Sequence, residues 1–444
     1  MDLIDRVRAV LPEVRRDLED LVRIPSVWSD PARRHDVHRS AEKVAQLLRD
    51  AGFGDVEIVS EGGAPAVIAH HPAPPGAPTV LLYAHHDVQP EGDAGQWDSA
   101  PFEPMERNGR LYGRGTADDK AGIATHLAAF RAHDGRPPVG VTVFVEGEEE
   151  CGSPSLTRLL AAHQHKLAAD VIVIADSDNW TADIPALTVS LRGLADCVVE
   201  VATLDHGLHS GLWGGAVPDA LTALIRLLAT LHDDQGNVAV AGLHESPVAP
   251  VDRDADWVRT ESGLLDGVGE IGSGTVAQRL WGKPAITVIG IDTTPIATAS
   301  NTLIPRASAK VSLRVAPGGD AQAHLEALRR HLQSHAPWGA RVTVTPGDVG
   351  QPYAIAATGP VYDAARAAFR QAWGVDAVDM GMGGSIPFIA EFATAFPDAT
   401  ILVTGVEDPG TQAHSINESL HLGVLERAAI TEALLLANLG APSE

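Results

Sequence analysis

Short apolar runs alternate with helix-periodic stretches along most of the 444-residue chain. The runs VTVFVEG (141–147) and ADVIVIADSD (169–178) are typical of buried strands, because they are short and almost continuously apolar. Strands that alternate with helices in this way predict a mainly parallel sheet with helices on both faces. The stretches with helical periodicity are 2–24, 36–52, 119–133 and 153–165.

The pattern changes after residue 193. Residues 196–203 and 308–315 alternate between apolar and polar, as half-exposed strands do, and a helical stretch follows each of them. Two such strand–helix units predict a small α+β, ferredoxin-like domain inserted into the main one. The segment 233–285 gives no readable pattern. The other elements expected in this part are helices at 218–232 and 320–335 and a strand at 341–346.

The first pattern resumes at residue 359. We therefore expect an α/β protein in which a doubly wound, mainly parallel sheet forms the main domain. That domain would consist of residues 1–192 and 353–444, with the inserted domain at 193–352. The elements expected at the end of the chain are a helix at 359–373, a glycine-rich loop at 381–385, a strand at 399–405 and a helix at 422–438.

Composition and charge narrow the class of protein. A hydrophobic content of 45% and a charged content of 20% describe a globular chain, and no apolar run is long enough to span a bilayer. The formal net charge of −25 argues against a nucleic acid or an anionic membrane as partner. The N-terminal segment lacks the order of a signal peptide, so we expect a cytoplasmic protein. Cys151 and Cys197 are expected to be reduced.

The predicted strand TVLLYAHHDVQP (79–90) ends in side chains that can bind metal. Side chains two residues apart in a strand share a face, so His85 and Asp87 point one way and His86 the other. Parallel sheets keep their sites at the carboxyl ends of the strands, and a carboxylate commonly fixes the ring of a metal-ligating histidine. Taken alone, this pair is also compatible with a solvated loop.

Four further segments place acids or histidine in comparable positions. LYGRGTADDKAG carries Asp118 and Asp119 just before a predicted helix, where a helix N-cap is the simpler interpretation. FVEGEEECGS crowds glutamates at the end of a predicted strand, where their charges repel unless a cation is bound. The other two segments are VIVIADSDNW (171–180), with Asp176 and Asp178, and DPGTQAHSINESL (408–420), with His414.

Imidazoles and carboxylates gathered in one pocket suit two divalent metals, with one carboxylate bridging ions roughly 3.5–4 Å apart. The set contains no thiolate, which favours an open hydrolytic site over a structural zinc site. The competing interpretation is that the acidic clusters only make the surface soluble.

In this order, the segments resemble those of the aminoacylase/carnosinase/glutamate carboxypeptidase metallopeptidase family over nearly the whole chain, least at 233–285. They look closest to its cytosolic, carnosinase-like dipeptidase branch. The resemblance implies a dipeptidase that uses two divalent metal ions, zinc first, although manganese and cobalt fit the same ligands. The motifs that carry it are YAHHDVQP, WDSAPFEP, LYGRGTADDK, EGEEECGS, SLRG, HSGLWGG and GGSIPF.

The resemblance also implies a role for each matching residue. Glu149 matches the general base, which takes a proton from a water bridging the two metals and passes it to the leaving amine. Asp118 matches the bridging carboxylate, and the peptide bond after it is often cis in the family. Asp178 aligns less well than Asp176. The other implied roles are His85 and Asp176 for the first metal, Glu150 and His414 for the second, and Asp87 as the partner of His85.

The inserted domain is implied to be a lid and dimerisation domain. His209, in LDHGLHSGLWGG, would stabilise the oxyanion in the site of a neighbouring subunit, so a homodimer is expected. Arg314 would pair with the terminal carboxylate of the substrate. Gly384 and Ser385, and more weakly Asn301, would contact the same carboxylate. Without the resemblance, His209 is interpreted as a turn histidine and Arg314 as an exposed edge-strand arginine.

Two other functions stay open for this set of residues. An amidohydrolase acting on N-acyl or N-carbamoyl amino acids needs the same water and base, and differs in what the inserted domain grips. A non-catalytic metal-binding homologue is disfavoured by the intact Glu149. Two positions depart from the family pattern: Ala84 stands where glycine is usual, and Cys151 where serine or threonine is frequent.

Overall fold

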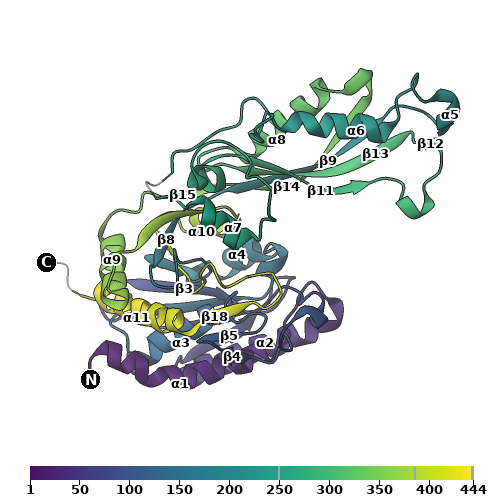
Figure 1. The fold of residues 1–444 in the computed structure, drawn as a ribbon. Coiled ribbons are helices and arrows are strands. Elements are labelled where there is room, and N and C mark those ends of the chain that lie inside the picture. Colours follow the sequence, from purple (N-terminus) through teal and green to yellow (C-terminus); the bar gives the residue numbers. More distant parts are fainter. Residues whose placement is uncertain (249–250, 385–386, 442–444) are drawn as a thin grey trace. The chain divides into compact units, whose positions relative to one another are not determined.

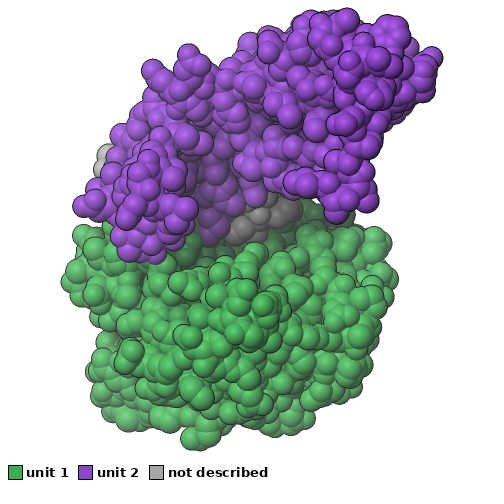
Figure 2. Space-filling model, turned by 45° about the vertical axis from the view of Figure 1, so that its right-hand side comes forward, with its two compact units in different colours: residues 1–189, 356–380, 388–444 green, residues 190–355, 381–387 purple. Residues whose placement is uncertain are grey.

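The computed structural model describes residues 1–248, 251–384 and 387–441. The chain divides into two compact units, which Figure 2 shows in green (unit 1) and purple (unit 2). No helix in the described ranges is long and apolar enough to cross a membrane. Unit 1 consists of Met1–Val189, Ala356–Met380 and Phe388–Glu444, and unit 2 of Ser190–Ile355 and Gly381–Pro387.

Unit 1 is built on a six-stranded sheet in the order β1-β2-β6-β3-β7-β17 (Figure 1). The first two pairings are antiparallel, and the β6–β3, β3–β7 and β7–β17 pairings are parallel, so the sheet is mainly parallel as the sequence predicts. The parallel strands therefore end at one edge. The strands are β1 (Asp55–Val59), β2 (Ala66–His71), β3 (Thr79–His85), β6 (Gly140–Glu146), β7 (Val171–Ile174) and β17 (Thr400–Val403).

Helices cover this sheet. α3 packs on β3, α2 on β1 and β2, and α4 on β6, while α1 and α11, from the two ends of the chain, contact each other (Figure 1). On α10, the rings of Phe388 and Phe392 pack against Tyr83 of β3, with centroids 4.4 and 5.5 Å away. The helices of unit 1 are α1 (Leu3–Val22), α2 (Arg34–Ala51), α3 (Lys120–Ala132), α4 (Leu156–Leu167), α9 (Pro360–Trp373), α10 (Pro387–Ala395) and α11 (Leu422–Leu439).

A small antiparallel sheet joins two distant parts of the chain in unit 1. Its order is β18-β5-β4, with Ser419 opposite Tyr112 and His421 opposite Arg110. This pairing places the loop before β18 next to the loop after β5. The strands are β4 (Met105–Arg107), β5 (Arg110–Tyr112) and β18 (Ser419–His421).

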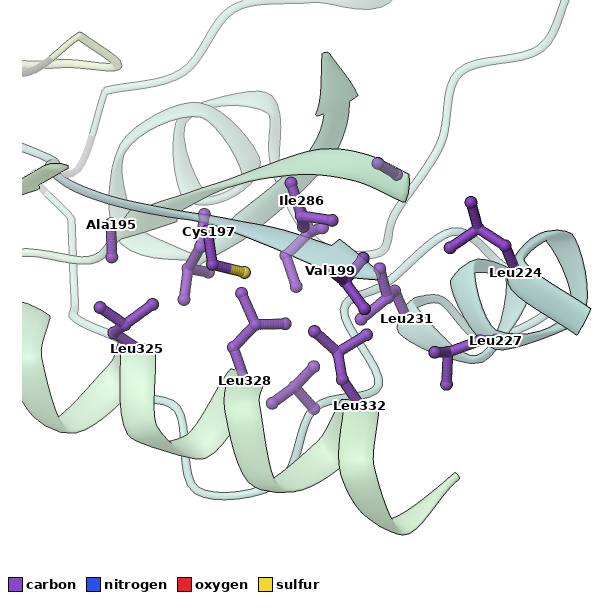
Figure 3. Close-up of a cluster of buried hydrophobic side chains, with 14 of the residues drawn as sticks. Ala195, Cys197, Val199, Leu224, Leu227, Leu231, Ile286, Leu325, Leu328 and Leu332 are labelled. Atoms are coloured by element: carbon purple, nitrogen blue, oxygen red, sulfur yellow. The ribbon is translucent and has the colours of Figure 1, made fainter. Parts of the chain in front are cut away.

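Unit 2 contains a fully antiparallel four-stranded sheet in the order β11-β13-β9-β14. Helices α6 and α8 pack on β9 and β13. Figure 3 shows the resulting core, in which Leu325, Leu328 and Leu332 of α8 meet Cys197 and Val199 of β9. The elements are β9 (Gly193–Ala202), β11 (Ala285–Asp292), β13 (Arg306–Val315), β14 (Arg341–Gly350), α6 (Ala220–Leu228) and α8 (Ala321–Ser334).

The structure confirms the helices and strands expected in this part, and adds elements that the sequence pattern did not show. β11 begins where the unreadable segment 233–285 ends, and the segment itself contains α7 (Ala255–Ser262) and a π-helical turn. The chain passes between the units four times: within β8 (Ala186–Leu191), after residue 355, within β16 (Val378–Met382) and after residue 387. The remaining short elements are β10 (Leu208–His209), α5 (Ser210–Trp213), β12 (Thr302–Leu303) and β15 (Tyr353–Ala354).

Candidate metal centre

The candidate site lies where the parallel strands of unit 1 end. β3 ends at His85, β6 leads into a single 3-10 turn (Glu149–Cys151), and Asp176 follows β7 by two residues. Because these strands are parallel and adjacent, their carboxyl ends project side chains into one region. The loop after β17 adds His414, and the loop before α3 adds Asp118.

Two groups of side chains can each hold a metal ion. Within each group, the ligand atoms lie within 4.8 Å of one another. In the first group, His85 Nε2 is 3.1 Å from Asp118 Oδ1 and 3.9 Å from Asp176 Oδ1. In the second group, His414 Nε2 is 2.9 Å from Asp118 Oδ2 and 3.2 Å from Glu150 Oε2. Asp118 therefore belongs to both groups and offers a different oxygen to each.

The structure gives Asp118 and its neighbour different roles. Asp119 is the N-cap of α3: its carboxylate accepts from the backbone N–H of Gly122 and, with the other oxygen, from that of His85. The N-cap interpretation is thus right for Asp119, while Asp118 faces the histidines. The peptide bond between the two aspartates is cis, as the family resemblance implies.

Asp87 organises the backbone around the site. Its main-chain oxygen is 3.0 Å from His85 Nδ1, and its carboxylate accepts from the N–H groups of Glu149 and Glu150 at 3.2 and 3.1 Å. Gln89 donates to Glu150 through its backbone N–H (2.9 Å) and its side-chain amide (2.8 Å). These contacts fix the backbone at both glutamates and the side chain of Glu150.

His86 points away from both groups. It is fully buried, and its Nε2 lies 2.9 Å from the carbonyl oxygen of Pro65. The alternation expected for a strand therefore separates the two histidines, and only His85 is available as a ligand.

Burial and close contact shift the pKa values in the site. Burial opposes ionisation of Asp118, but hydrogen bonds with His414 and His85 outweigh it and hold its pKa well below the usual value. The hydrogen bonds with Asp118 and Glu150 raise the pKa of His414 to about 11. Burial raises the pKa of Asp176 to about 7 and that of Glu149 well above its usual value.

These shifts indicate a surplus of buried negative charge. Carboxylates outnumber the two imidazoles, and each raises the cost of ionising the next. A divalent cation in either group would favour the ionised carboxylates and remove this penalty. Oxygen and imidazole ligands without a thiolate fit zinc, manganese or cobalt in an open site.

Glu149 lies beside the first group without belonging to either. Its Oε2 is 3.9 Å from His85 Nε2, and its side chain is 17% exposed. It is therefore buried enough to be desolvated, yet a small molecule can still reach it. A raised pKa and a position at the edge of a ligand cluster are properties of a general base.

The sequence reasoning missed residues that lie against the site. Arg114 and Glu418 form a buried ion pair at 2.6 Å, behind Asp118. Glu407 is half-buried close to Asp118, Asp176 and Asp178, and its desolvation, with the charge of Asp178, raises its pKa well above the usual value. No local signal marks these residues, because they reach the site only through tertiary contacts.

Asp178 belongs to neither ligand group. Its backbone forms a parallel bridge with Glu407, beyond the end of β7. Placing Asp176 before Asp178 as a candidate ligand agrees with this geometry.

The candidate substrate contacts lie in unit 2. β10 pairs with β12, which sets His209 opposite Thr302, and the N–H of Ser210 donates to the oxygen of Asn301 at 2.9 Å. His209 and Asn301 are therefore neighbours. His209 also caps the short α5 helix, since its Nδ1 accepts from the N–H of Gly211.

Arg314 lies on β13, opposite Leu194 of β9 and Ala285 of β11. β13 is an inner strand of the sheet, so the edge-strand interpretation of this arginine is wrong. Partial burial lowers the pKa of Arg314. Gly384 follows β16, and Ser385 lies outside the described residues.

Comparison with known proteins identifies the family of such a centre. The model of peptidase family M20/M25/M40 matches residues 81–438. A cysteinylglycine-S-conjugate dipeptidase of Corynebacterium striatum is 35% identical over 96% of this chain and 95% of its own length. The Cys-Gly metallodipeptidase DUG1 of Saccharomyces cerevisiae is 27% identical over 95% of this chain and 94% of its own length.

Solved structures agree on the fold. The yeast dipeptidase Dug1p superposes with a TM-score of 0.83 at 23% identity, covering 99% of this chain and 98% of its own. Human carnosine dipeptidase 1 also gives a TM-score of 0.83, at 24% identity, with the same coverage. The two-unit architecture is therefore shared along the whole chain.

Proposed function

Because the chain belongs to peptidase family M20/M25/M40, we propose that it is a dipeptidase that works with two divalent metal ions. The observation that carries the proposal is the double use of Asp118, whose Oδ1 faces His85 and whose Oδ2 faces His414. A carboxylate shared by two ligand groups is the arrangement needed to bridge two ions.

His85 and Asp176 would hold the first ion, and Glu150 and His414 the second, with Asp118 between them. Zinc is the first candidate, and manganese or cobalt would fit the same donors. When bound, such ions acidify water and polarise an amide carbonyl. Asp87 supports the centre by fixing the ring of His85 and the backbone of both glutamates.

Glu149 would take a proton from the attacking water at its carboxylate and pass it to the nitrogen of the leaving amine. Burial raises the pKa of Glu149 in the metal-free protein, which makes its carboxylate a better proton acceptor than that of an exposed glutamate. The raised pKa and the exposed edge of the side chain support this role.

A dipeptide is the substrate class that the relatives favour, because the Corynebacterium and yeast proteins are named as dipeptidases. On this chain, Arg314 would bind the terminal carboxylate of the substrate by a bidentate contact. Gly384, Ser385 and Asn301 would add polar contacts to the same group. These contacts come from unit 2, which would then select the substrate while unit 1 performs the chemistry.

The test compares hydrolysis of a dipeptide panel with hydrolysis of N-acyl and N-carbamoyl amino acids by the metal-loaded protein. We expect the dipeptides to be cleaved. In the Glu149→Gln variant, turnover should fall by about 10²–10⁴-fold, because proton transfer is lost while the ligands remain. Metal content should stay at two ions per chain.

Cleavage of the acyl amino acids alone would identify an amidohydrolase instead. Unchanged turnover in Glu149→Gln would refute the general-base role, and absence of bound metal after dialysis would refute the metal centre.

We also propose that unit 2 pairs two chains, so that His209 completes the site of the neighbouring subunit. On α5, directly after His209, Leu212 is 78% exposed and Trp213 49% exposed. Large apolar side chains at the tip of a domain are typical of a protein interface. His209 would donate to the oxyanion there.

A further inference from the structure

Arg114 and Glu418 form a buried ion pair in unit 1 that no step of the proposed chemistry uses. Their side chains are 2% and 0% exposed, and Arg114 Nη1 donates to Glu418 Oε2 at 2.6 Å. Burying two charges is costly, and a pair of hydrophobic residues often serves stability equally well. The contacts around this ion pair show what else it does.

Glu418 holds the loop that carries Asp118. Its Oε2 accepts from the N–H of Gly115 at 3.1 Å, and its Oε1 accepts from the N–H groups of Ala117 and Asp118 at 3.1 and 3.3 Å. Every partner is a donor, so the side chain acts as a carboxylate. The loop can curl around it because Gly115 adopts a φ of +80°.

Arg114 holds the segments next to the other two ligands of the second group. Its Nη2 donates to the carbonyl oxygen of Ser415, the residue after His414, at 3.0 Å. The same nitrogen donates to the carbonyl oxygen of Pro90 at 3.3 Å. Pro90 follows Gln89, which donates two hydrogen bonds to the carboxylate of Glu150.

The ion pair therefore contacts the segments that carry Asp118 and His414 directly, and it reaches Glu150 indirectly, through the segment of Pro90 and Gln89. His414 depends on such support more than the other ligands do, since its side chain is 59% exposed and its φ is +61°. His85 and Asp176, by contrast, directly follow or end strands of the central sheet. Their positions follow from the sheet itself.

We propose that Arg114 and Glu418 are positioning residues for the second metal ion, and that they hold Asp118, Glu150 and His414 at ligand distance. This inference rests on the proposed two-metal function. It predicts that the two ions respond differently when the pair is broken, which a general loss of stability would not produce.

The test is titration of the metal-free protein with cobalt(II), whose absorption reports binding, in the Glu418→Gln variant. Glutamine has the shape of glutamate, but its NH2 group is a hydrogen-bond donor. It would face the donors of Arg114 or of the loop, so the contacts of the carboxylate are lost without a change of shape. Because Asp118 serves both groups, we expect the first ion to bind somewhat more weakly, and the second, which also depends on the contacts of Arg114, to bind roughly 10–100-fold more weakly.

Two further variants, each of which leaves only one ligand group complete, show which ion is weakened. In Asp176→Asn the second group alone stays complete, and Glu418→Gln should abolish most of its binding. In His414→Asn the first group alone stays complete, and Glu418→Gln should weaken its binding through Asp118, but less than it weakens the second group. The matched control is Glu432→Gln, which breaks another buried pair in unit 1, with His126 at 2.9 Å, and should leave both ions bound.

If Glu418→Gln fails to fold, the double variant Arg114→Met, Glu418→Gln takes its place, because it leaves no uncompensated charge buried. Equal weakening of both ions, or no weakening, would overturn the positioning role. A wild-type protein that binds fewer than two ions would instead refute the two-metal function on which the inference rests.

Discussion

At the scale of single residues, the adjacent histidines of YAHHDVQP show how strand geometry divides chemistry from structure. His85 ends β3 facing the carboxylates, and His86 faces the interior. His86 can donate from Nε2 to the oxygen of Pro65, but within the described residues its Nδ1 has no hydrogen-bond partner. A proton on that nitrogen would be buried without an acceptor, and burial accordingly lowers the pKa of His86 to about 4.

His86 should make the metal-free protein sensitive to acid. The unfolded chain binds this proton below a pKa of about 6.5, whereas the folded protein resists it down to about 4. Stability contributed by neutral His86 is therefore present above pH 6.5 and is lost as the pH falls towards 4. The shift corresponds to roughly 3 kcal/mol at about 1.4 kcal/mol per pKa unit.

The measurement is the free energy of unfolding at several pH values, for the wild type and His86→Gln. The glutamine keeps a donor for Pro65 but cannot titrate, so its stability should fall less steeply between pH 6.5 and 4. Parallel curves for the two proteins would contradict this account.

At the scale of elements, the stability of a helix depends on what it buries. α6 and α7 of unit 2 both begin with an aspartate whose side chain accepts from a backbone N–H: Asp219 from Thr222 at 2.9 Å, and Asp254 from Trp257 at 2.7 Å. α6 places Ala220, Ala223, Leu224 and Leu227 in the core, whereas α7 has no buried residue. The same type of N-cap therefore occurs on a helix that contributes to the core of unit 2 and on a helix that does not.

Removing the two caps should separate these contributions. Asp219→Ala should cost about 1 kcal/mol, which corresponds to roughly fivefold faster hydrogen exchange across 220–231. The control, Asp254→Ala, should speed exchange only within 255–262, because α7 packs too little to affect the core. Hydrogen exchange by mass spectrometry measures both, and identical effects on the core of unit 2 would contradict the argument.

At the scale of the whole molecule, two units with separate cores divide the proposed work. Unit 1 carries every residue of both ligand groups, and unit 2 carries His209, Asn301, Arg314 and Gly384. His209 can act either in the site of its own chain or in the site of a second chain. Mixing two inactive variants distinguishes these arrangements.

Mixing His209→Ala chains with Glu149→Gln chains should restore activity if His209 acts across a dimer. Each variant alone should be nearly inactive. After subunit exchange, half of the dimers are mixed, and one of their two sites has both residues intact, so about a quarter of wild-type activity should return. Turnover of the mixture, together with mass by analytical ultracentrifugation, measures this. No recovery in a proven dimer would place His209 in the site of its own chain, and a fully active monomer would refute the dimer.

The sequence by itself determined the helices and strands with a clear hydrophobic period, and the residues able to bind metal. Periodicity is a local property, so the helices at 320–335 and 422–438 and the strands ending near His85 and Asp176 can be read from neighbouring residues alone. The family resemblance then ordered these candidates. The sequence did not predict β11, because its pattern of apolar and polar residues does not differ from that of the segment before it.

Only the tertiary structure decided which candidates meet. Whether Asp118 or Asp119 faces the histidines depends on which one the helix uses as its cap, and local sequence offers both. Glu418 lies 300 residues from Asp118 along the chain, and the β18–β5 pairing is what sets it behind that loop. Contacts of this kind depend on how distant segments pack, and packing leaves no period in the sequence.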